Sequence, residues 1–142
     1  MTPTSRRRFD ENGKSVNTHG DYPDAVRWVA AKENVPLIEL NGMTAILFNA
    51  LGVDNSTKAF VHYPAGTFPG QTRTLKDNTH FSTYGAYEVS KCVIEGMKKA
   101  DLEIVKYLRP DYSGFDPAQP DSFESFKWNL GSFTENEKPD GN

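Results

Sequence analysis

The stretch Asp77-Asn78-Thr79-His80-Phe81-Ser82 connects an irregular Gly/Pro-rich segment, residues 64–76, to the most regular helical pattern of the chain. Ser82 is a typical N-cap residue, and Phe81 just before it is placed to anchor the turn by hydrophobic contact. From Ser82 to about residue 100, small or apolar residues recur at helical spacing, which predicts a core-facing helix. These residues are Ala86, Val89, Val93, Met97 and Ala100. The small residues at its start predict a helix that packs close to a sheet.

Asp77 and His80 lie three residues apart on the turn that enters this helix. At that spacing both side chains can face one cleft, where the carboxylate accepts a hydrogen bond from one imidazole nitrogen and leaves the other free to take a proton. This is the base-and-orienter pair of a hydrolytic triad. The same spacing also fits a helix-capping turn with a surface histidine. The long loop 64–76 favours the catalytic interpretation, because loops of this length in compact domains are often functional.

The chain upstream of the motif begins with a helix and an apolar run. Asp21 and Pro23 predict a helix over residues 22–33, which Asn34 ends as a residue tolerant of left-handed geometry. Residues 35–40 are short, apolar and follow a helix, so they predict a buried strand of a parallel sheet.

A second helix is predicted over residues 42–51, with Asn41 as its N-cap and Gly52 at its end. Residues 60–63 predict a brief extended segment, and residues 102–108 predict a short helical or extended one. One clear strand cannot cover the apolar faces of three helices, so the sequence predicts only part of a domain.

After residue 110 the chain is rich in Pro, Asp, Ser, Gly and Phe. The aromatic residues of this segment predict that it lies across the body of the protein. They are Phe115, Phe123, Phe126 and Trp128.

Length and composition fit one folded domain, since 142 residues with 37% hydrophobic side chains can bury a moderate core. The net charge of −3 argues against a nucleic-acid or anionic-membrane partner. No apolar run approaches the ~20 residues that span a bilayer, and the polar, basic first residues contain no signal peptide. The single cysteine, Cys92, excludes an internal disulfide and a cysteine-based metal site, and its place on a helix predicts a buried, inert thiol.

The motif at 77–82, followed by Tyr84-Gly85-Ala86, resembles the last conserved block of the SGNH (GDSL-type) hydrolases, and most closely that of the rhamnogalacturonan acetylesterases. Three earlier stretches agree with the same family in the same order: residues 2–9 (TPTSRRRF), 17–23 (NTHGDYP) and 35–41 (VPLIELN). The resemblance covers roughly residues 2–110.

The resemblance implies an α/β fold, namely the C-terminal part of a three-layer α/β/α, flavodoxin-like domain with a five-stranded parallel sheet. Residues 1–110 are expected to form this portion and residues 111–142 a C-terminal extension. The resemblance also implies a Ser-Asp-His mechanism that removes acetyl groups from pectic, rhamnogalacturonan-type polysaccharide without a cofactor. By that match His80 is the general base and Asp77 its orienter.

The family's nucleophile lies in a Gly-Asp-Ser block near the N-terminus of the complete enzyme, and the Asn of its oxyanion hole lies in a Gly-x-Asn block. Neither block occurs here, because Gly52-Val53-Asp54-Asn55 has the residues in the wrong order and Ser113 fits a turn serine. The chain is therefore expected to be inactive without a serine-bearing N-terminal half. The expected partners are that half, or a second copy by strand or domain exchange, and an acetylated polysaccharide. The alternative is a non-catalytic carbohydrate-binding or interaction module.

His19 lies in the family-like stretch 17–23 and is a candidate for the substrate groove, although a turn histidine fits it equally. Arg7 is a candidate for bidentate contact with an acidic galacturonate unit, although a solvated basic turn is the commoner case. His62 fits a structural role. Members of the family are usually secreted or periplasmic, so the resemblance predicts an extracellular or periplasmic location. No metal site is expected, because Asp77, His80 and His62 do not provide three well-spaced ligands.

Overall fold

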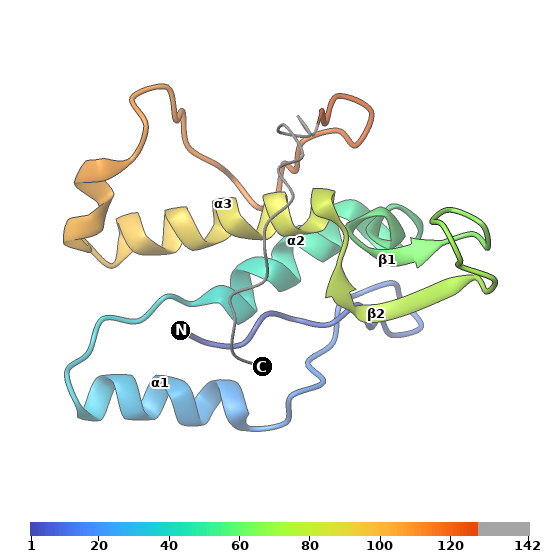
Figure 1. Cartoon of the computed structure of the whole chain (residues 1–142). Coiled ribbons are helices and arrows are strands. Elements are labelled where there is room, and N and C mark those ends of the chain that lie inside the picture. The colour runs from blue at the N-terminus through green and yellow to red at the C-terminus, as the bar shows by residue number, and fades with distance from the viewer. Residues whose placement is uncertain (128–142) are drawn as a thin grey trace, which may run out of the picture.

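A computed structural model describes residues 1–127 of the chain. Within them, three α-helices, two 3-10 helices and two strands form a small α/β domain (Figure 1). In chain order the elements are α1 (Tyr22–Lys32), α2 (Leu40–Asn55), η1 (Ser56–Ala59), β1 (Phe60–Tyr63), β2 (Leu75–Phe81), α3 (Thr83–Lys99) and η2 (Glu103–Tyr107). In this part of the chain no helix combines the length and the apolar composition that crossing a membrane requires.

Three helix ends form at the residues that the sequence predicts. Asn34 has a φ of 52° just after α1, in the left-handed region that ends a helix. Gly52 has a φ of 73° and interrupts α2 at the predicted end, although helical residues continue to Asn55. Ser82 caps α3, because its Oγ accepts a hydrogen bond of 3.1 Å from the backbone N–H of Gly85.

β1 and β2 form a two-stranded antiparallel sheet, the one sheet among residues 1–127. The expected α/β class is confirmed in this coarse form. The expected parallel sheet and three-layer arrangement are not found in the described part of the chain. A loop such as 64–74 can join two antiparallel strands directly. Parallel strands need a crossover connection, and within residues 1–127 no such connection joins two strands.

The predicted buried strand at residues 35–40 is wrong. Residues 35–39 run as irregular chain, Val35 is 57% exposed, and α2 already begins at Leu40. One backbone hydrogen bond reaches this segment, from the N–H of Thr2 to the carbonyl of Ile38 at 3.0 Å. Pro36 has no N–H, so it cannot donate to a neighbouring strand. An apolar run becomes a strand only where neighbouring strands satisfy its backbone, and among the described residues neither β1 nor β2 pairs with it.

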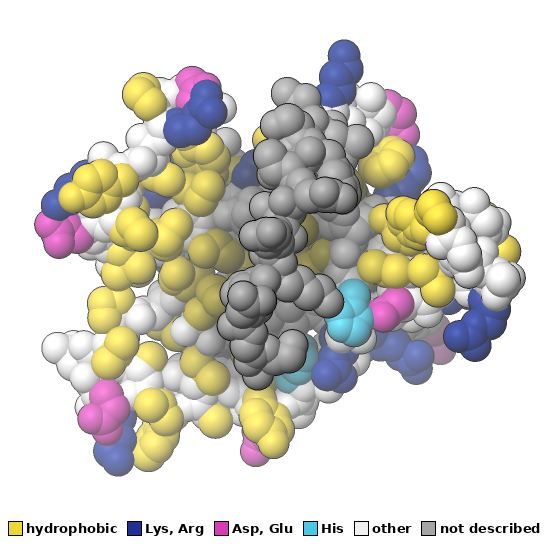
Figure 2. Space-filling view, viewed as in Figure 1, with side chains coloured by type: hydrophobic (Ala, Val, Ile, Leu, Met, Phe, Trp, Pro, Cys, Tyr) yellow, Lys and Arg dark blue, Asp and Glu magenta, His cyan; other side chains and the backbone are white. Residues whose placement is uncertain are grey.

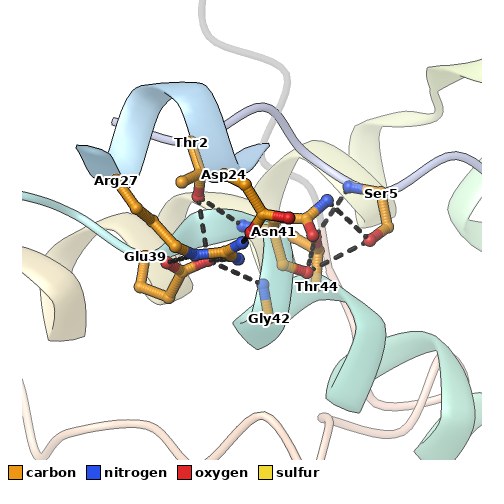
Figure 3. Close-up of polar contacts among 8 residues, drawn as sticks. All are labelled: Thr2, Ser5, Asp24, Arg27, Glu39, Asn41, Gly42 and Thr44. Carbon is orange, nitrogen blue, oxygen red and sulfur yellow. Dashed lines mark hydrogen bonds and ion pairs between the residues drawn. The ribbon is translucent and has the colours of Figure 1, made fainter. Parts of the chain in front are cut away.

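The N-terminus of α2 is capped by Glu39 rather than by the predicted Asn41 (Figure 3). Oε1 of Glu39 accepts hydrogen bonds from the N–H of Gly42 at 3.3 Å and from Oγ1 of Thr2 at 3.1 Å. Arg27 of α1 donates to both carboxylate oxygens, each at 2.7 Å, and these hydrogen bonds lower the pKa of Glu39. The network ties α1 and the first residues of the chain to α2.

The core lies between α2, β1 and the first turns of α3. The Phe48 and Phe60 rings are 5.0 Å apart, and the Phe81 ring lies 5.1 Å from that of Phe60. Phe81 therefore anchors the turn before α3 by hydrophobic contact, as the sequence predicts. The buried hydrophobic residues of this core are Leu40, Leu47, Phe48, Ala59, Phe60, Tyr84, Val89 and Cys92.

The buried face of α3 differs from the predicted apolar stripe. Val89 is buried, but Ala86 is exposed, and Glu88 and Lys91 are buried beside Val89. Nζ of Lys91 lies 2.8 Å from Oε1 of Glu88 and 2.8 Å from Oδ2 of Asp121. Burial raises the pKa of the Glu88 carboxyl. This charged cluster depends on a C-terminal segment crossing α3, which the periodicity of α3 alone cannot reveal.

The segment after η2 lies across the body of the protein over the part that the structure describes. Oη of Tyr112 donates a hydrogen bond of 2.9 Å to Glu95 of α3, and the Phe123 ring packs edge-on against Tyr84 with 5.4 Å between centroids. The expected packing of Trp128 falls outside the described residues.

An apolar surface extends along α1. Pro23 is the single buried residue of this helix, whereas Tyr22 is 74% and Val29 is 48% exposed. Figure 2 shows hydrophobic side chains gathered over the part of the molecule that α1 occupies. With the irregular segment after α1, these side chains border a hollow of about 450 Å³. We call this region the α1 surface; its main residues are Met1, Tyr22, Val26, Val29, Val35 and Leu37.

Candidate active site

The stretch that carries Asp77 and His80 leaves the ladder of the sheet. Lys76 and Phe81 both pair with β1, but the four residues between them, 77–80, stand opposite the single β1 residue Val61. These four residues therefore protrude from the strand just before α3 begins. The predicted turn exists, although it is formed inside β2 rather than directly between the loop and the helix.

The protruding turn is closed by Asp77. Its Oδ1 accepts hydrogen bonds from the backbone N–H groups of Thr79, at 2.7 Å, and His80, at 3.0 Å. A short carboxylate that bonds the backbone two and three residues ahead is a usual way to stabilise such a turn. Asp77 thereby fixes the backbone that carries His80.

The other carboxylate oxygen of Asp77 holds the imidazole. Oδ2 of Asp77 lies 2.7 Å from Nδ1 of His80. A carboxylate only accepts hydrogen bonds, so Nδ1 carries the proton and the neutral ring presents the lone pair of Nε2. The N–H of His80, followed by its ring, lowers the pKa of Asp77 to about 2, so the carboxylate stays ionised at neutral pH.

The imidazole points to solvent. The His80 side chain is 77% exposed and that of Asp77 is 38% exposed. Among residues 1–127, no hydrogen bond is formed to Nε2 of His80. An oriented imidazole with a free Nε2 can take a proton from a hydroxyl group, which is the task of a general base.

No serine among the described residues completes this pair. The nearest in sequence is Ser82, whose Oγ caps α3 and donates a hydrogen bond of 2.6 Å to the carbonyl of Lys58. Ser5 is buried, and its Oγ donates to the carbonyl of Asn41 at 3.1 Å. Neither hydroxyl is free to attack a substrate.

Two further sequence candidates make contacts within the protein. The Arg7 guanidinium donates to Oγ of Ser56 at 3.0 Å, to Oδ1 of Asn78 at 3.2 Å and to the carbonyl of Val53 at 2.6 Å. Nε2 of His19 lies 2.8 Å from the carbonyl oxygen of Thr4. The structure does not bring either side chain to the Asp77–His80 pair, and their substrate contacts stay predictions.

The sequence analysis missed one residue of this site, Asn78. Its Oδ1 lies 2.8 Å from Nε2 of His62, and it also accepts the hydrogen bond from Arg7. The position of Asn78 between Asp77 and His80 is the signal that could have indicated a role. Among residues 1–127, no three His, Cys, Asp or Glu side chains gather as a metal site.

Comparison with known proteins finds two similar chains. The chain is 41% identical over 108 residues to the rhamnogalacturonan acetylesterase RhgT of Bacillus subtilis (strain 168). It is 31% identical, also over 108 residues, to the probable rhamnogalacturonan acetylesterase YesY of the same organism. The chain resembles rhamnogalacturonan acetylesterases. The resemblance expected from the motifs is thereby confirmed, and with it the likeness to a hydrolase of the esterase type.

The similarity is partial on both sides. Each match covers 76% of this chain but only 47% of RhgT and 45% of YesY, so the chain spans about half the length of the curated relatives it matches. No family model matches the chain, and no solved structure matches it significantly.

Proposed function

We propose that this chain supplies the base end of a Ser-Asp-His carbohydrate acetylesterase, with His80 as the general base and Asp77 as its orienter. The observation that carries the proposal is the 2.7 Å contact between Nδ1 of His80 and Oδ2 of Asp77, combined with an exposed imidazole. The likeness to rhamnogalacturonan acetylesterases supplies the reaction and the substrate class.

The proposed reaction proceeds in two steps. Nε2 of His80 removes the hydroxyl proton of a serine while the Oγ of that serine attacks the acetyl carbonyl carbon. When the tetrahedral intermediate collapses, the sugar oxygen leaves with that proton and an acetyl-serine remains. Water then attacks the acetyl-serine while His80 takes its proton and returns it to the serine, which releases acetate. Asp77 stabilises the imidazolium at both stages.

The serine and the oxyanion-hole donors would come from a segment that corresponds to the uncovered half of the relatives. We propose that this segment packs on the α1 surface. There it would supply the parallel sheet that residues 1–127 lack. In support, Tyr22 and Val35 are 74% and 57% exposed and border the same hollow, so they belong to one contiguous apolar surface.

The proposed substrate is an acetylated pectic polysaccharide of the rhamnogalacturonan type. Such a polymer is too large and polar to cross a membrane unaided. We therefore propose an extracellular or periplasmic place of action.

The test is acetate release from acetylated rhamnogalacturonan. The chain is assayed alone and after co-expression with the region of RhgT that the match does not cover. We expect release only from the combination. A His80→Ala chain in the same combination should lose on the order of 10²- to 10⁴-fold in rate, the usual contribution of a general base. Asn12→Ala, an exposed turn residue, is the control.

Three outcomes contradict the proposal. Release by the chain alone would place a nucleophile within it. Unchanged release by the His80→Ala combination would remove His80 from the reaction. Binding of pectic oligosaccharides without turnover, in a combination shown to be folded, would favour a non-catalytic carbohydrate-binding module.

A further inference from the structure

Between the ladder positions Lys76 and Phe81, the turn that carries Asp77 and His80 is bound to the rest of the described chain through one residue, Asn78. Within residues 1–127, the side-chain hydrogen bonds that reach residues 77–80 from elsewhere in the chain all end on Asn78. The contacts of Asp77 and His80 with each other and with Thr79 stay inside the turn. The orientation of the pair relative to the rest of the protein therefore depends on Asn78 as well as on Lys76 and Phe81, which flank the turn and pair with β1.

Two side chains from different parts of the chain fix the Asn78 amide. Oδ1 of Asn78 accepts a hydrogen bond from Arg7 at 3.2 Å and one from Nε2 of His62 at 2.8 Å. The backbone N–H of Arg7 also donates to the Asn78 carbonyl at 2.9 Å. Since the guanidinium only donates, the acceptor is the amide oxygen, and His62 carries its proton on Nε2.

The other two guanidinium nitrogens of Arg7 are also hydrogen-bonded. Nε donates to Oγ of Ser56, which is buried, and the second terminal nitrogen donates to the Val53 carbonyl at 2.6 Å. One planar guanidinium thus joins the N-terminal segment, the end of α2 and the start of η1 to the protruding turn. A lysine ammonium at this position lacks the rigid fork that reaches all three acceptors.

We propose that Arg7 and His62 are positioning residues of the catalytic base, acting on the Asp77–His80 pair through Asn78. This rests on the function proposed above, and it gives Arg7 a structural task in place of direct substrate contact. Neither residue touches the reacting atoms. Small displacements of a catalytic group lower rates strongly, by on the order of 10²-fold for about 1 Å.

The first measurement is the tautomer of His80 in the chain itself, read from the ¹⁵N shifts of its ring nitrogens. In the unaltered protein we expect the form protonated on Nδ1. Asn78→Ala removes both outside hydrogen bonds to the side chain. The turn should then loosen and hold Asp77 against Nδ1 of His80 less of the time, which shifts the population toward the form protonated on Nε2. Arg7→Lys should shift it in the same direction. Arg8→Lys is the matched control, because the Arg8 side chain makes no hydrogen bond or ion pair with the described residues.

The second measurement is kcat and KM for acetate release by this chain combined with the serine-bearing segment. Asn78→Ala and His62→Leu should lower kcat about tenfold or more with little change in KM, since they misplace the base rather than remove a substrate contact. His62→Gln, which keeps an N–H donor, should restore part of the loss. Thermal melts of each variant identify any that fail to fold, and Arg7→Lys then serves as the milder substitution.

The two measurements separate the positioning role from the proposed function. A tautomer shift without any acetate release from the unaltered combination would uphold the positioning role and reject the esterase. If the unaltered combination releases acetate but the variants change neither the His80 tautomer nor kcat, the positioning role is rejected and the proposed function stands. A rise in KM at constant kcat for Arg7→Lys would reject it as well, and would instead indicate the substrate contact.

Discussion

A Cβ atom on Gly85 would lie 1.8 Å from the carbonyl oxygen of Ala59. The first turn of α3 therefore rests directly on the backbone where η1 joins β1. The same Ala59 carbonyl accepts a hydrogen bond of 3.1 Å from the N–H of Ser82. The close approach of Gly85 and the Ser82 hydrogen bond together fix where α3 starts relative to the sheet. They therefore also fix the position of the turn that carries His80, which lies just before α3.

We expect Gly85→Ala to destabilise the protein by about 2 kcal/mol or more, because a backbone atom cannot move aside for the added methyl group. Gly42→Ala in the first turn of α2 is the matched control. Its Cβ would lie 3.7 Å from the nearest atom, and alanine favours a helix over glycine by about 1 kcal/mol. Urea unfolding of both variants checks the difference. Equal stability of the two would contradict the close approach.

The elements that local chemistry specifies could be predicted from the sequence. Asn34, Gly52 and Ser82 end or begin helices for reasons confined to their own neighbourhood, and the structure confirms all three. The Asp77–His80 contact belongs to the same class, because Asp77 closes a turn with the two residues that follow Asn78. Spacing along the chain shows that such a contact can form, although the same spacing also fits a plain capping turn.

Features that depend on distant segments could not be predicted in this way. Residues 35–40 have the composition of a buried strand, but no strand among the described residues pairs with them, so residues 35–39 stay irregular and Leu40 begins α2. The buried Glu88 and Lys91 pair with each other within α3, but Lys91 also pairs with Asp121, which lies 30 residues further along the chain. Arg7 meets Asn78 across an even longer separation.

The Asp77 carboxylate should remain ionised to strongly acidic pH. Its pKa is lowered from 3.8 to about 2, first by the N–H of His80 and then by the ring. A lowered pKa means that the folded state favours the charged form. The resulting stabilisation is complete above the ordinary value and is lost as the pH falls through about 2.

The ¹³C shift of the Asp77 carboxyl carbon, followed against pH, checks this value. His80→Ala removes the ring hydrogen bond but keeps the backbone one, so the Asp77 pKa should rise only part of the way to its ordinary value. The urea-unfolded chain supplies the reference titration. A midpoint near 3.8 in the folded protein would show that the contact does not persist in solution.

The Cys92 thiol should be unreactive in the folded protein. It is fully buried, and burial, followed by the nearby Glu88 charge, raises its pKa to about 12. The thiolate is the reactive form, so almost none is available at pH 8. We expect no reaction with Ellman's reagent before unfolding and one equivalent after it. Ser90→Cys, on the exposed side of the same helix, should react at once; rapid reaction of Cys92 itself would indicate that α3 opens readily.

The α1 surface should make the isolated chain associate with itself. Val35 and its neighbours expose apolar area that gains free energy on leaving water, at about 25 cal/mol per Å². Val35→Lys should therefore reduce the apparent mass in sedimentation at a given concentration. Ile104→Lys is the matched control, since Ile104 is equally exposed, at 57%, but belongs to η2 and does not border the hollow beside α1.

Addition of the serine-bearing segment distinguishes the two ways of covering this surface. If that segment packs on the α1 surface, it should dissociate the self-associated form, and Val35→Lys should weaken both interactions together. If self-association persists unchanged when acetate-releasing activity is restored, the segment binds elsewhere, and the parallel sheet is not completed at α1. A monomeric chain at all concentrations would show that the exposed side chains of α1 do not drive association at all.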